Sequence, residues 1–342
     1  MESTKYSSSS FDPSLSNRIY NDTFTTKEKE ALIQLKSELV NETEFTSSST
    51  MLNDDNKLIC FLRARKLDIP KSKKMILKYL NWYKTNNVNE IYFNYIWDKQ
   101  NEFTLFYPHG FHKTAKSGEP ILLQALGHVK VNKLFQTFTL DSIMKLSIKL
   151  YETMQREVFP KCSQAAQKYI HSVITIIDLR KLGKDILNNK IYALLQVILQ
   201  TCQDYYPESL GNIFIINTGF AFKVMYTVVK TFIDKKTTSK IKTYGKKYNE
   251  ALNAVISKEN LPDLFGGKCK CEPHGCLFSN AGPWNDNNNA RNVNNVQVSD
   301  EIMKKRKELC DSIRSTPIID DETTTGDHPI NDEQNDGQLT NK

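Results

Sequence analysis

The segment CKCEPHGC, residues 269–276, gathers side chains of the kinds that bind transition metals: Cys269, Cys271, His274 and Cys276. A structural zinc site takes four such ligands and usually places two or more residues between paired cysteines. Here a single residue separates Cys269 from Cys271, which fits that spacing poorly. The segment by itself leaves two interpretations open, a small metal module and a sulfur-rich structural loop.

The motifs of the common enzyme classes are absent. The sequence contains no GxxxxGK(S/T) phosphate loop and no GxGxxG, GxSxG or HExxH motif. His109 and His112, in PHGFH, could form a metal site, but an ordinary loop before a strand is the favoured interpretation. The predicted strands are aliphatic and lack the interleaved aromatic and basic residues that bind nucleic acid. We therefore expect no catalytic residues, no enzymatic activity and no nucleic-acid partner.

Two polar side chains fall on predicted apolar faces. At 100° per residue, Arg65 continues the buried stripe of Leu58 and Leu62 on a predicted helix. Thr175 shares one strand face with Val173. An arginine that bonds carbonyls at a helix end explains the first, and the strand preference of threonine explains the second. The alternative for Arg65 is a guanidinium directed inward at an anion such as a phosphate.

Composition places the chain among globular proteins. It has 342 residues, of which 39% are apolar and 25% charged, and its mean hydropathy is −0.50. The longest apolar stretches fall far short of the roughly 20 residues that span a bilayer, and no secretory signal opens the chain. The odd number of cysteines, seven, favours free thiols in a reducing compartment. We expect a cytoplasmic protein.

Charge and low-complexity segments divide the chain. Residues 285–342 contain seven Lys and Arg and twelve Asp and Glu, a net charge of −5. Because the whole chain has a net charge of +7, residues 1–284 carry a net charge of +12. A basic body of this kind can meet an anionic membrane surface. The expected parts are a disordered segment 1–25, a folded part 26–284, and a low-complexity linker and acidic tail 285–342, with one short charged helix in DEIMKKRKELCDSIR.

The folded part begins with helices and continues with alternating strands and helices. Leucine spacing predicts a helix after the candidate cap Thr26, a second helix includes DDNKLICFLRARK, and Pro70 opens a third. The strands EPILLQAL, HSVITIIDL and GNIFIIN then alternate with helices over 140–159, NNKIYALLQVILQTCQ and FKVMYTVVKTFI. Such alternation predicts an α/β fold whose parallel strands are joined by crossover helices.

Five segments stand together in the order of one known family. They are LICFLRARKLDIPKSKKMILKYLNWY, IIDLRKLG, YYPESLGNIFIINTGFAFKVMYTVVKTFIDKKTTSKI, NLPDLFGGKC and GCLFSNAGPW. They resemble the CRAL-TRIO lipid-binding family, and within it the secretory-pathway phosphatidylinositol/phosphatidylcholine transfer proteins. The resemblance implies a helical N-terminal subdomain over 26–95 and an α/β lipid-binding domain over 96–284, with a lipid cavity and a gate helix.

The resemblance also bears on the cysteine segment. Members of the family end in GG-x-C-x-C followed by GGC or a close variant, and this stands here as GGKCKCEPHGC. His274 falls outside that pattern. The resemblance therefore implies a structural loop without a metal.

The family's phosphatidylinositol headgroup contacts map onto four residues. They are the second arginine of FLRAR, the glutamate of YYPE, and the threonine and lysine of the T-x-S-K stretch, here Arg65, Glu208, Thr237 and Lys240. Arg65 and Lys240 would neutralise the phosphate, while Thr237 and Glu208 would bond phosphate or inositol hydroxyls. Lys66 is expected to pair with Glu208.

The site for a second lipid matches the family less well. The family uses tyrosines near PHGFHKTAKSGEPILL and two hydroxyls in the central strand, where this chain has Phe111, Leu122, Val173 and Thr175. Only Thr175 keeps a hydroxyl. Phosphatidylcholine is therefore in doubt as the second ligand.

Together these implications describe a carrier of one phosphatidylinositol without a cofactor. It would serve phospholipid transport between membranes or present the lipid to a phosphatidylinositol kinase, in contact with Golgi or other endomembranes. The gate helix, about residues 219–233, would place Phe222, Met225, Val229 and Phe232 on one face, with Lys223, Lys230, Lys235 and Lys236 holding it on anionic membrane. Two alternatives stay open, a lipid-sensing regulatory scaffold and a carrier of a sterol or tocopherol.

Overall fold

The computed structural model describes residues 24–46, 54–273, 275–285 and 298–317. Contacts divide the chain into a first unit, Met1–Asn87 with Ala166–Tyr169, and a second unit, Val88–Ala165 with Ile170–Lys342. Most of the predicted disordered N-terminus and of the predicted linker and acidic tail lies outside the described residues. The expected boundary at residue 95 stays a prediction.

The first unit is helical. Leu32, Leu35 and Leu39 form the buried stripe of its first helix, as their spacing predicted. The cap is Thr25 and not Thr26, because Thr25 forms a reciprocal capping box with Glu28. The same Glu28 accepts a hydrogen bond at 2.7 Å from Arg63, two helices further along. The helices are α2 (Thr26–Leu39), α3 (Thr43–Thr46), α5 (Asp55–Ala64) and α6 (Ile69–Thr85).

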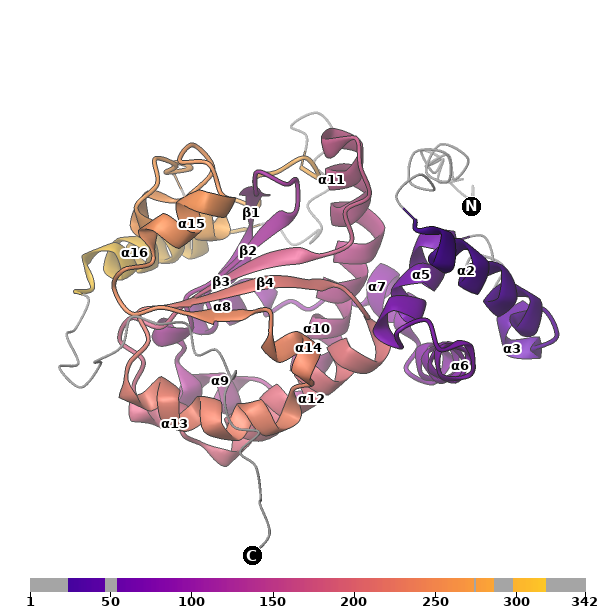
Figure 1. The fold of residues 1–342 in the computed structure, drawn as a ribbon. Coiled ribbons are helices and arrows are strands. Elements are labelled where there is room, and N and C mark those ends of the chain that lie inside the picture. The colour runs from indigo at the N-terminus through magenta and orange to yellow at the C-terminus, as the bar shows by residue number, and fades with distance from the viewer. Residues whose placement is uncertain (1–23, 47–53, 274, 286–297, 318–342) are drawn as a thin grey trace, which may run out of the picture. The chain divides into compact units, whose positions relative to one another are not determined.

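The second unit is built on a five-stranded sheet in the order β1-β2-β3-β4-β5 (Figure 1). β1 pairs antiparallel with β2, and the other pairs are parallel. The strands are β1 (His109–Thr114), β2 (Pro120–Gln124), β3 (Val173–Asp178), β4 (Leu210–Ile216) and β5 (Ile241–Thr243). The predicted parallel α/β sheet is confirmed. The prediction of a loop at His109 and His112 is wrong, because both residues lie in β1. This strand lacks apolar alternation of its own and is stabilised by antiparallel pairing with β2.

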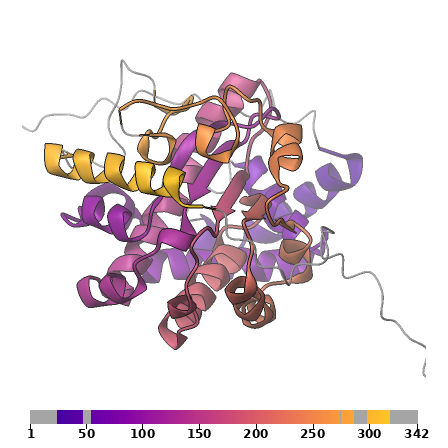
Figure 2. The same cartoon turned by 90° about the vertical axis from the view of Figure 1, so that its left-hand side faces the viewer.

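Helices cover both faces of this sheet. Figures 1 and 2 show α9, α12 and α13 on one side and α15 and α16 on the other. No helix within the described ranges is long and apolar enough to cross a membrane. The α-helices are α7 (Val88–Asn94), α8 (Gln100–Phe106), α9 (Val131–Thr137), α10 (Leu140–Thr153), α11 (Phe159–Ala166), α12 (Asn189–Tyr205), α13 (Phe220–Val229), α14 (Lys235–Thr238), α15 (Asn249–Val255) and α16 (Asp300–Ser315).

Short helical turns complete the second unit. The helix predicted over 140–159 is divided, because a π-helical segment, η3 (Met154–Val158), separates α10 from α11. The predicted charged helix in the tail is confirmed as α16, which buries Cys310 and Ile313. The 3₁₀ turns are η2 (Leu126–His128), η4 (Lys184–Ile186), η5 (Lys230–Phe232), η6 (Asp263–Phe265) and η7 (Cys276–Phe278).

Alternation along β3 separates two kinds of packing. Ile174 and Ile176 point into a close-packed core that α15, α16 and the segment 261–278 complete. Thr175 and Ile177 point to the opposite side, toward α10, α12 and α13.

The carboxyl end of β3 carries a buried ion pair. The Asp178 carboxylate accepts hydrogen bonds from Arg180 Nε at 2.7 Å and from Asn217 Nδ2 at 2.7 Å. Both charged side chains are almost fully buried, at 0% and 5% exposure. Asn217 directly follows β4, so this network joins the ends of two neighbouring strands.

Asp178→Asn should destabilise the protein by about 3–5 kcal/mol, because it leaves the Arg180 guanidinium buried without its counter-charge. The measurement is the urea midpoint followed by circular dichroism. Glu301→Gln, which breaks the exposed Glu301–Lys305 pair on α16, is the control and should leave the midpoint unchanged. Equal midpoints for wild type and Asp178→Asn would contradict the importance of the buried pair.

Candidate functional site

A cavity of about 250 Å³ lies between the sheet and the helices α10, α12 and α13. Most of its lining is aliphatic, which suits hydrocarbon more than a polar ligand. Its volume is below the roughly 300–1,000 Å³ of ordinary ligand pockets. A two-tailed lipid therefore requires a wider form of the cavity. The sheet contributes His109, Leu122, Gln124, Val173, Thr175, Ile177, Leu210 and Ile213 to the lining.

Helix α13 closes one side of this cavity. Phe222 and Met225 are buried, and Met225 lines the cavity itself. Val229 ends α13 half-buried, and Phe232 is half-buried in the following 3₁₀ turn η5. The predicted inward face is thus buried at Phe222 and Met225 and only half-buried at Val229 and Phe232.

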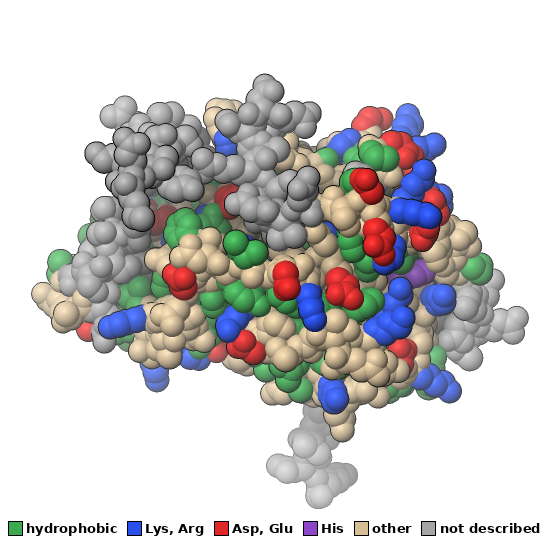
Figure 3. Space-filling model, turned by 180° about the vertical axis from the view of Figure 1, so that it is seen from behind, with side chains coloured by type: hydrophobic (Ala, Val, Ile, Leu, Met, Phe, Trp, Pro, Cys, Tyr) green, Lys and Arg blue, Asp and Glu red, His purple; other side chains and the backbone are tan. Residues whose placement is uncertain are grey.

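The outer face of α13 is also apolar. Phe220, Val224 and Val228 are 61%, 38% and 36% exposed, and their spacing of four residues puts them on one stripe. Acidic and basic side chains are interspersed on the face drawn in Figure 3. Lys223 is exposed on α13 directly before Val224 of this stripe, and Lys235 is exposed at the start of α14. An apolar helix face next to lysines is suited to contact with an anionic membrane.

Three of the predicted headgroup residues come together on two neighbouring segments. Lys240 precedes β5 and donates from Nζ to the Leu210 carbonyl at 2.6 Å. Glu208 lies two residues before Leu210 and accepts from Lys236 at 2.5 Å. Thr237 is buried in α14, where its hydroxyl donates to Asp234 at 3.1 Å. A carboxylate, a hydroxyl and two ammonium groups thus lie at the amino ends of β4 and β5.

The turn that carries Glu208 is held from both sides. Tyr206 is buried and donates to the Glu152 carboxylate at 2.9 Å, which also accepts from Arg156 at 2.7 Å. Ser209 is buried and donates back to the Tyr206 carbonyl at 2.6 Å. Between these anchors Glu208 adopts a left-handed backbone with φ of 61°, uncommon for a residue other than glycine. These bonds hold the backbone on both sides of Glu208.

Arg65 belongs to the first unit. It is the C-cap of α5, half-buried, and its guanidinium donates to the Ala64 carbonyl at 3.1 Å. Arg65 thus matches the interpretation of an arginine that bonds a backbone carbonyl at a helix end. Lys66 is exposed in the same unit, and within the second unit the partner of Glu208 is Lys236. The roles of Arg65 and Lys66 toward a ligand stay predictions.

The candidate second-lipid residues divide between two places. Leu122, Val173 and Thr175 line the cavity. Phe111 is buried against Trp284, with ring centroids 5.8 Å apart, in a neighbouring pocket.

Polar cavity residues that the sequence did not single out include Tyr107 and Tyr151. The Tyr107 hydroxyl donates to Gln124 at 3.3 Å, and burial raises the pKa of Tyr107 to about 12, which keeps it neutral. The apolar face of the predicted helix over 140–159 contains Tyr151, a signal that could have identified it. Tyr107 precedes β1 and carries no such signal.

Side chains suited to a metal gather on the other face of the sheet. His112 of β1 meets Cys269, Cys271 and Cys276 there, within the part of the chain that the structure describes. Burial lowers the pKa of His112 to about 4, and Lys113 adds to the effect, so the ring is neutral at pH 7. His274 lies outside the described residues.

Known proteins match this chain over its central part. Residues 106–267 match the CRAL/TRIO domain. The phosphatidylinositol/phosphatidylcholine transfer protein SFH7 of Arabidopsis thaliana is 39% identical over 235 residues, which cover 68% of this chain and 43% of that protein. SFH9 of the same plant is 35% identical over 258 residues, 75% of this chain and 44% of that protein. The chain thus spans about half the length of these relatives.

Two further matches cover most of the length of the matched protein. The Sec14 cytosolic factor of Schizosaccharomyces pombe is 35% identical over 233 residues, 68% of this chain and 81% of that protein. The crystal structure of Sfh5 superposes with a TM-score of 0.56 over 84% of this chain and 98% of that chain. At 15% sequence identity, the likeness to Sfh5 shows the fold alone.

Ile177→Phe, on the cavity side of β3, should leave the free energy of unfolding nearly unchanged, because the added atoms enter open space. Ile176→Phe is the matched control on the next residue, which is fully buried in the close-packed core. It should cost about 1–3 kcal/mol. Urea unfolding measures both. Equal losses would show that the cavity side of β3 has no room.

Proposed function

The chain belongs to the CRAL/TRIO domain family, and we propose that it is a phosphatidylinositol carrier. It extracts one lipid from a membrane, encloses the acyl chains in the cavity beneath α13, and delivers the lipid to another membrane or presents it to a lipid kinase. The observation that carries this proposal is an aliphatic cavity against one face of the sheet, closed by a helix that is apolar on both sides. The choice of lipid is supported by the relatives SFH7 and SFH9, which are named as phosphatidylinositol/phosphatidylcholine transfer proteins.

The free energy of exposing acyl chains to water explains why the cavity must close while the lipid is carried. Two acyl chains hold roughly 30 CH₂ groups, each worth about 0.8 kcal/mol on leaving water. Their exposure would cost far more than a folded domain can supply. Because the cavity measures about 250 Å³, we propose that α13 moves outward when lipid enters. Its outer stripe of Phe220, Val224 and Val228 would then rest on bilayer.

The headgroup would bind at the amino ends of β4 and β5. Lys240 and Lys236 supply positive charge for the phosphate, and Thr237 with Glu208 supplies partners for hydroxyls. Arg65, carried over by resemblance, would add a guanidinium from the first unit. A sterol or tocopherol has no phosphate, so these charges favour an inositol phospholipid over either.

We also propose where the carrier works. It would act in the cytoplasm, with transient contact at Golgi or other endomembranes, and without a cofactor. The relatives are named as transfer proteins and a cytosolic factor, and no catalytic group enters this account.

Lys240→Met should lower phosphatidylinositol transfer by one to two decades while the fold stays intact. The lost charge-assisted bond is worth about 1.5–3 kcal/mol. Glu208→Ala should act in the same direction. The measurement is transfer of labelled phosphatidylinositol between vesicles, with circular dichroism to check folding. Lys184→Met, at an exposed lysine of η4, is the control. Wild-type transfer by both site variants would contradict the proposed headgroup site.

Phosphatidylcholine transfer should be weaker than phosphatidylinositol transfer. Leu122 offers no ring for the choline cation, and Val173 offers no hydroxyl for the phosphate. Each missing bond costs about 1–3 kcal/mol. A paired vesicle assay with both labelled lipids measures this, beside the double variant Leu122→Tyr, Val173→Ser, which should gain phosphatidylcholine transfer. Equal transfer of both lipids by the wild type, or no gain of phosphatidylcholine transfer in the variant, would show that Leu122 and Val173 do not limit phosphatidylcholine.

A further inference from the structure

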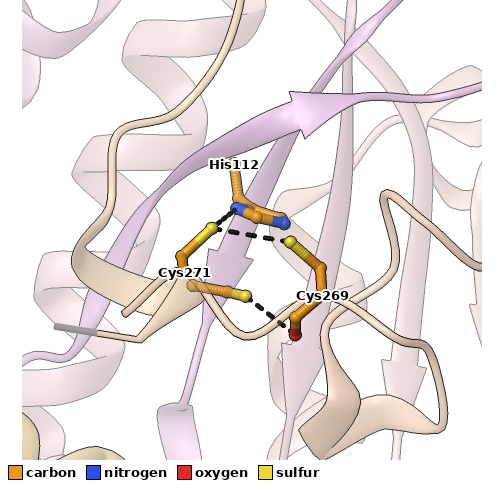
Figure 4. Close-up of side chains that lie close together, drawn as sticks. His112, Cys269 and Cys271 are labelled. Atoms are coloured by element: carbon orange, nitrogen blue, oxygen red, sulfur yellow. Dashed lines mark hydrogen bonds between the residues drawn. The ribbon is translucent and has the colours of Figure 1, made fainter. Parts of the chain in front are cut away.

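Four metal-ligating side chains converge behind the sheet, away from the cavity. Figure 4 shows His112, Cys269 and Cys271 directed toward one another from β1 and from the segment that follows η6. The Cys269 and Cys271 sulfurs are 3.5 Å apart, and Cys271 Sγ lies 3.8 Å from His112 Nδ1. Cys276 completes the group, and all four ligand atoms lie within 4.8 Å of one another.

We propose that these four side chains bind one structural zinc ion. Zn–S bonds of about 2.3 Å and a Zn–N bond of about 2.0 Å in a tetrahedron separate the ligand atoms by roughly 3.5–3.8 Å. The observed sulfur–sulfur separation of 3.5 Å and sulfur–nitrogen separation of 3.8 Å each lie within about 0.3 Å of the tetrahedral value. Three thiolates and one imidazole are a common ligand set for structural zinc, and four protein ligands leave no open position for a substrate.

The imidazole is oriented as a metal ligand requires. His112 is fully buried, and its Nε2 lies 3.0 Å from the Asn260 carbonyl oxygen. A carbonyl only accepts, so Nε2 carries the proton and the lone pair of Nδ1 faces the sulfurs. Ligating histidines commonly donate their other ring N–H to a carbonyl in this way. Ser279 Oγ, 3.1 Å from Nδ1, also lies 3.0 Å from the Cys276 carbonyl, to which it can donate instead.

The backbone explains how the short cysteine spacing still works. Cys271 has a φ of 48°, in the left-handed region, and this turn brings its sulfur back toward Cys269. Gly275, with a φ of 76°, then directs the chain into η7, where Cys276 is buried. The poor spacing of Cys269 and Cys271 therefore does not exclude zinc.

The expectation of no metal considered only ligands inside the segment. His112 precedes Cys271 by 159 residues, so no local pattern groups the two residues. Only the fold brings β1 against the segment 269–276. A zinc ion there would join the edge strand β1 to the chain beyond α15 and would stabilise that end of the unit.

The test is the metal content of the full chain, purified under reducing conditions and passed into chelator-treated buffer. Mass spectrometry of the elements should find about one zinc per chain in the wild type. Cys271→Ser and His112→Ala should reduce it to background. Cys310→Ala, a buried cysteine of the same core outside the ligand group, is the control and should keep the zinc.

A second measurement keeps the test decisive if a variant fails to fold. Wild-type protein reconstituted with Co²⁺ should show the visible absorption of tetrahedral cobalt thiolate, and added Zn²⁺ should remove it. Strong chelation should lower the melting temperature. A wild type without metal whose Cys269, Cys271 and Cys276 react freely with a thiol reagent would overturn the proposal. A disulfide between Cys269 and Cys271, or equal zinc in every variant, would overturn it as well.

Discussion

Neighbouring side chains of β3 point to opposite faces of the sheet, and the two faces meet different demands. Ile174 and Ile176 must be packed without gaps, since loss of contacts there costs stability directly. Thr175 and Ile177 border a cavity, where imperfect packing is the useful property. The strand period of two residues makes this division possible within one strand. A shift of register by one residue would exchange the faces and remove both the core and the cavity.

The two ends of the sheet also have different roles. Ligands of open α/β sheets usually bind beyond the carboxyl ends of the strands. In this protein that end of β3 and β4 is joined by Asp178, Arg180 and Asn217 in a buried network. The residues we assign to the headgroup, Glu208 and Lys240, instead precede β4 and β5. In the proposed function the ligand would therefore lie along one face of the sheet, with its polar end at the amino side of β4 and β5.

Sequence patterns were sufficient for the parts of the fold that depend on local periodicity. The first-unit helices α2, α5 and α6, the strands β2, β3 and β4, and the tail helix α16 follow from apolar spacing and caps, whereas the short α3 and the three-residue β5 were not predicted. β1 was not predicted, because its residues, HGFHKT, have no strand pattern of their own and form a strand by pairing with β2. Glu208, Thr237 and Lys240 were named by resemblance, whereas Tyr107 and the grouping of His112 with the cysteines depend on contacts between distant segments. Tertiary contacts of this kind leave no local pattern to detect.

The central claim is that the cavity holds an inositol phospholipid. The most direct measurement is native mass spectrometry of the full chain after incubation with mixed vesicles of phosphatidylinositol, phosphatidylcholine and sterol, followed by extraction and identification of the bound lipid. The account predicts one phosphatidylinositol per chain, lost in Lys240→Met. A chain that carries no lipid, or that carries the sterol in preference to phosphatidylinositol, would contradict it.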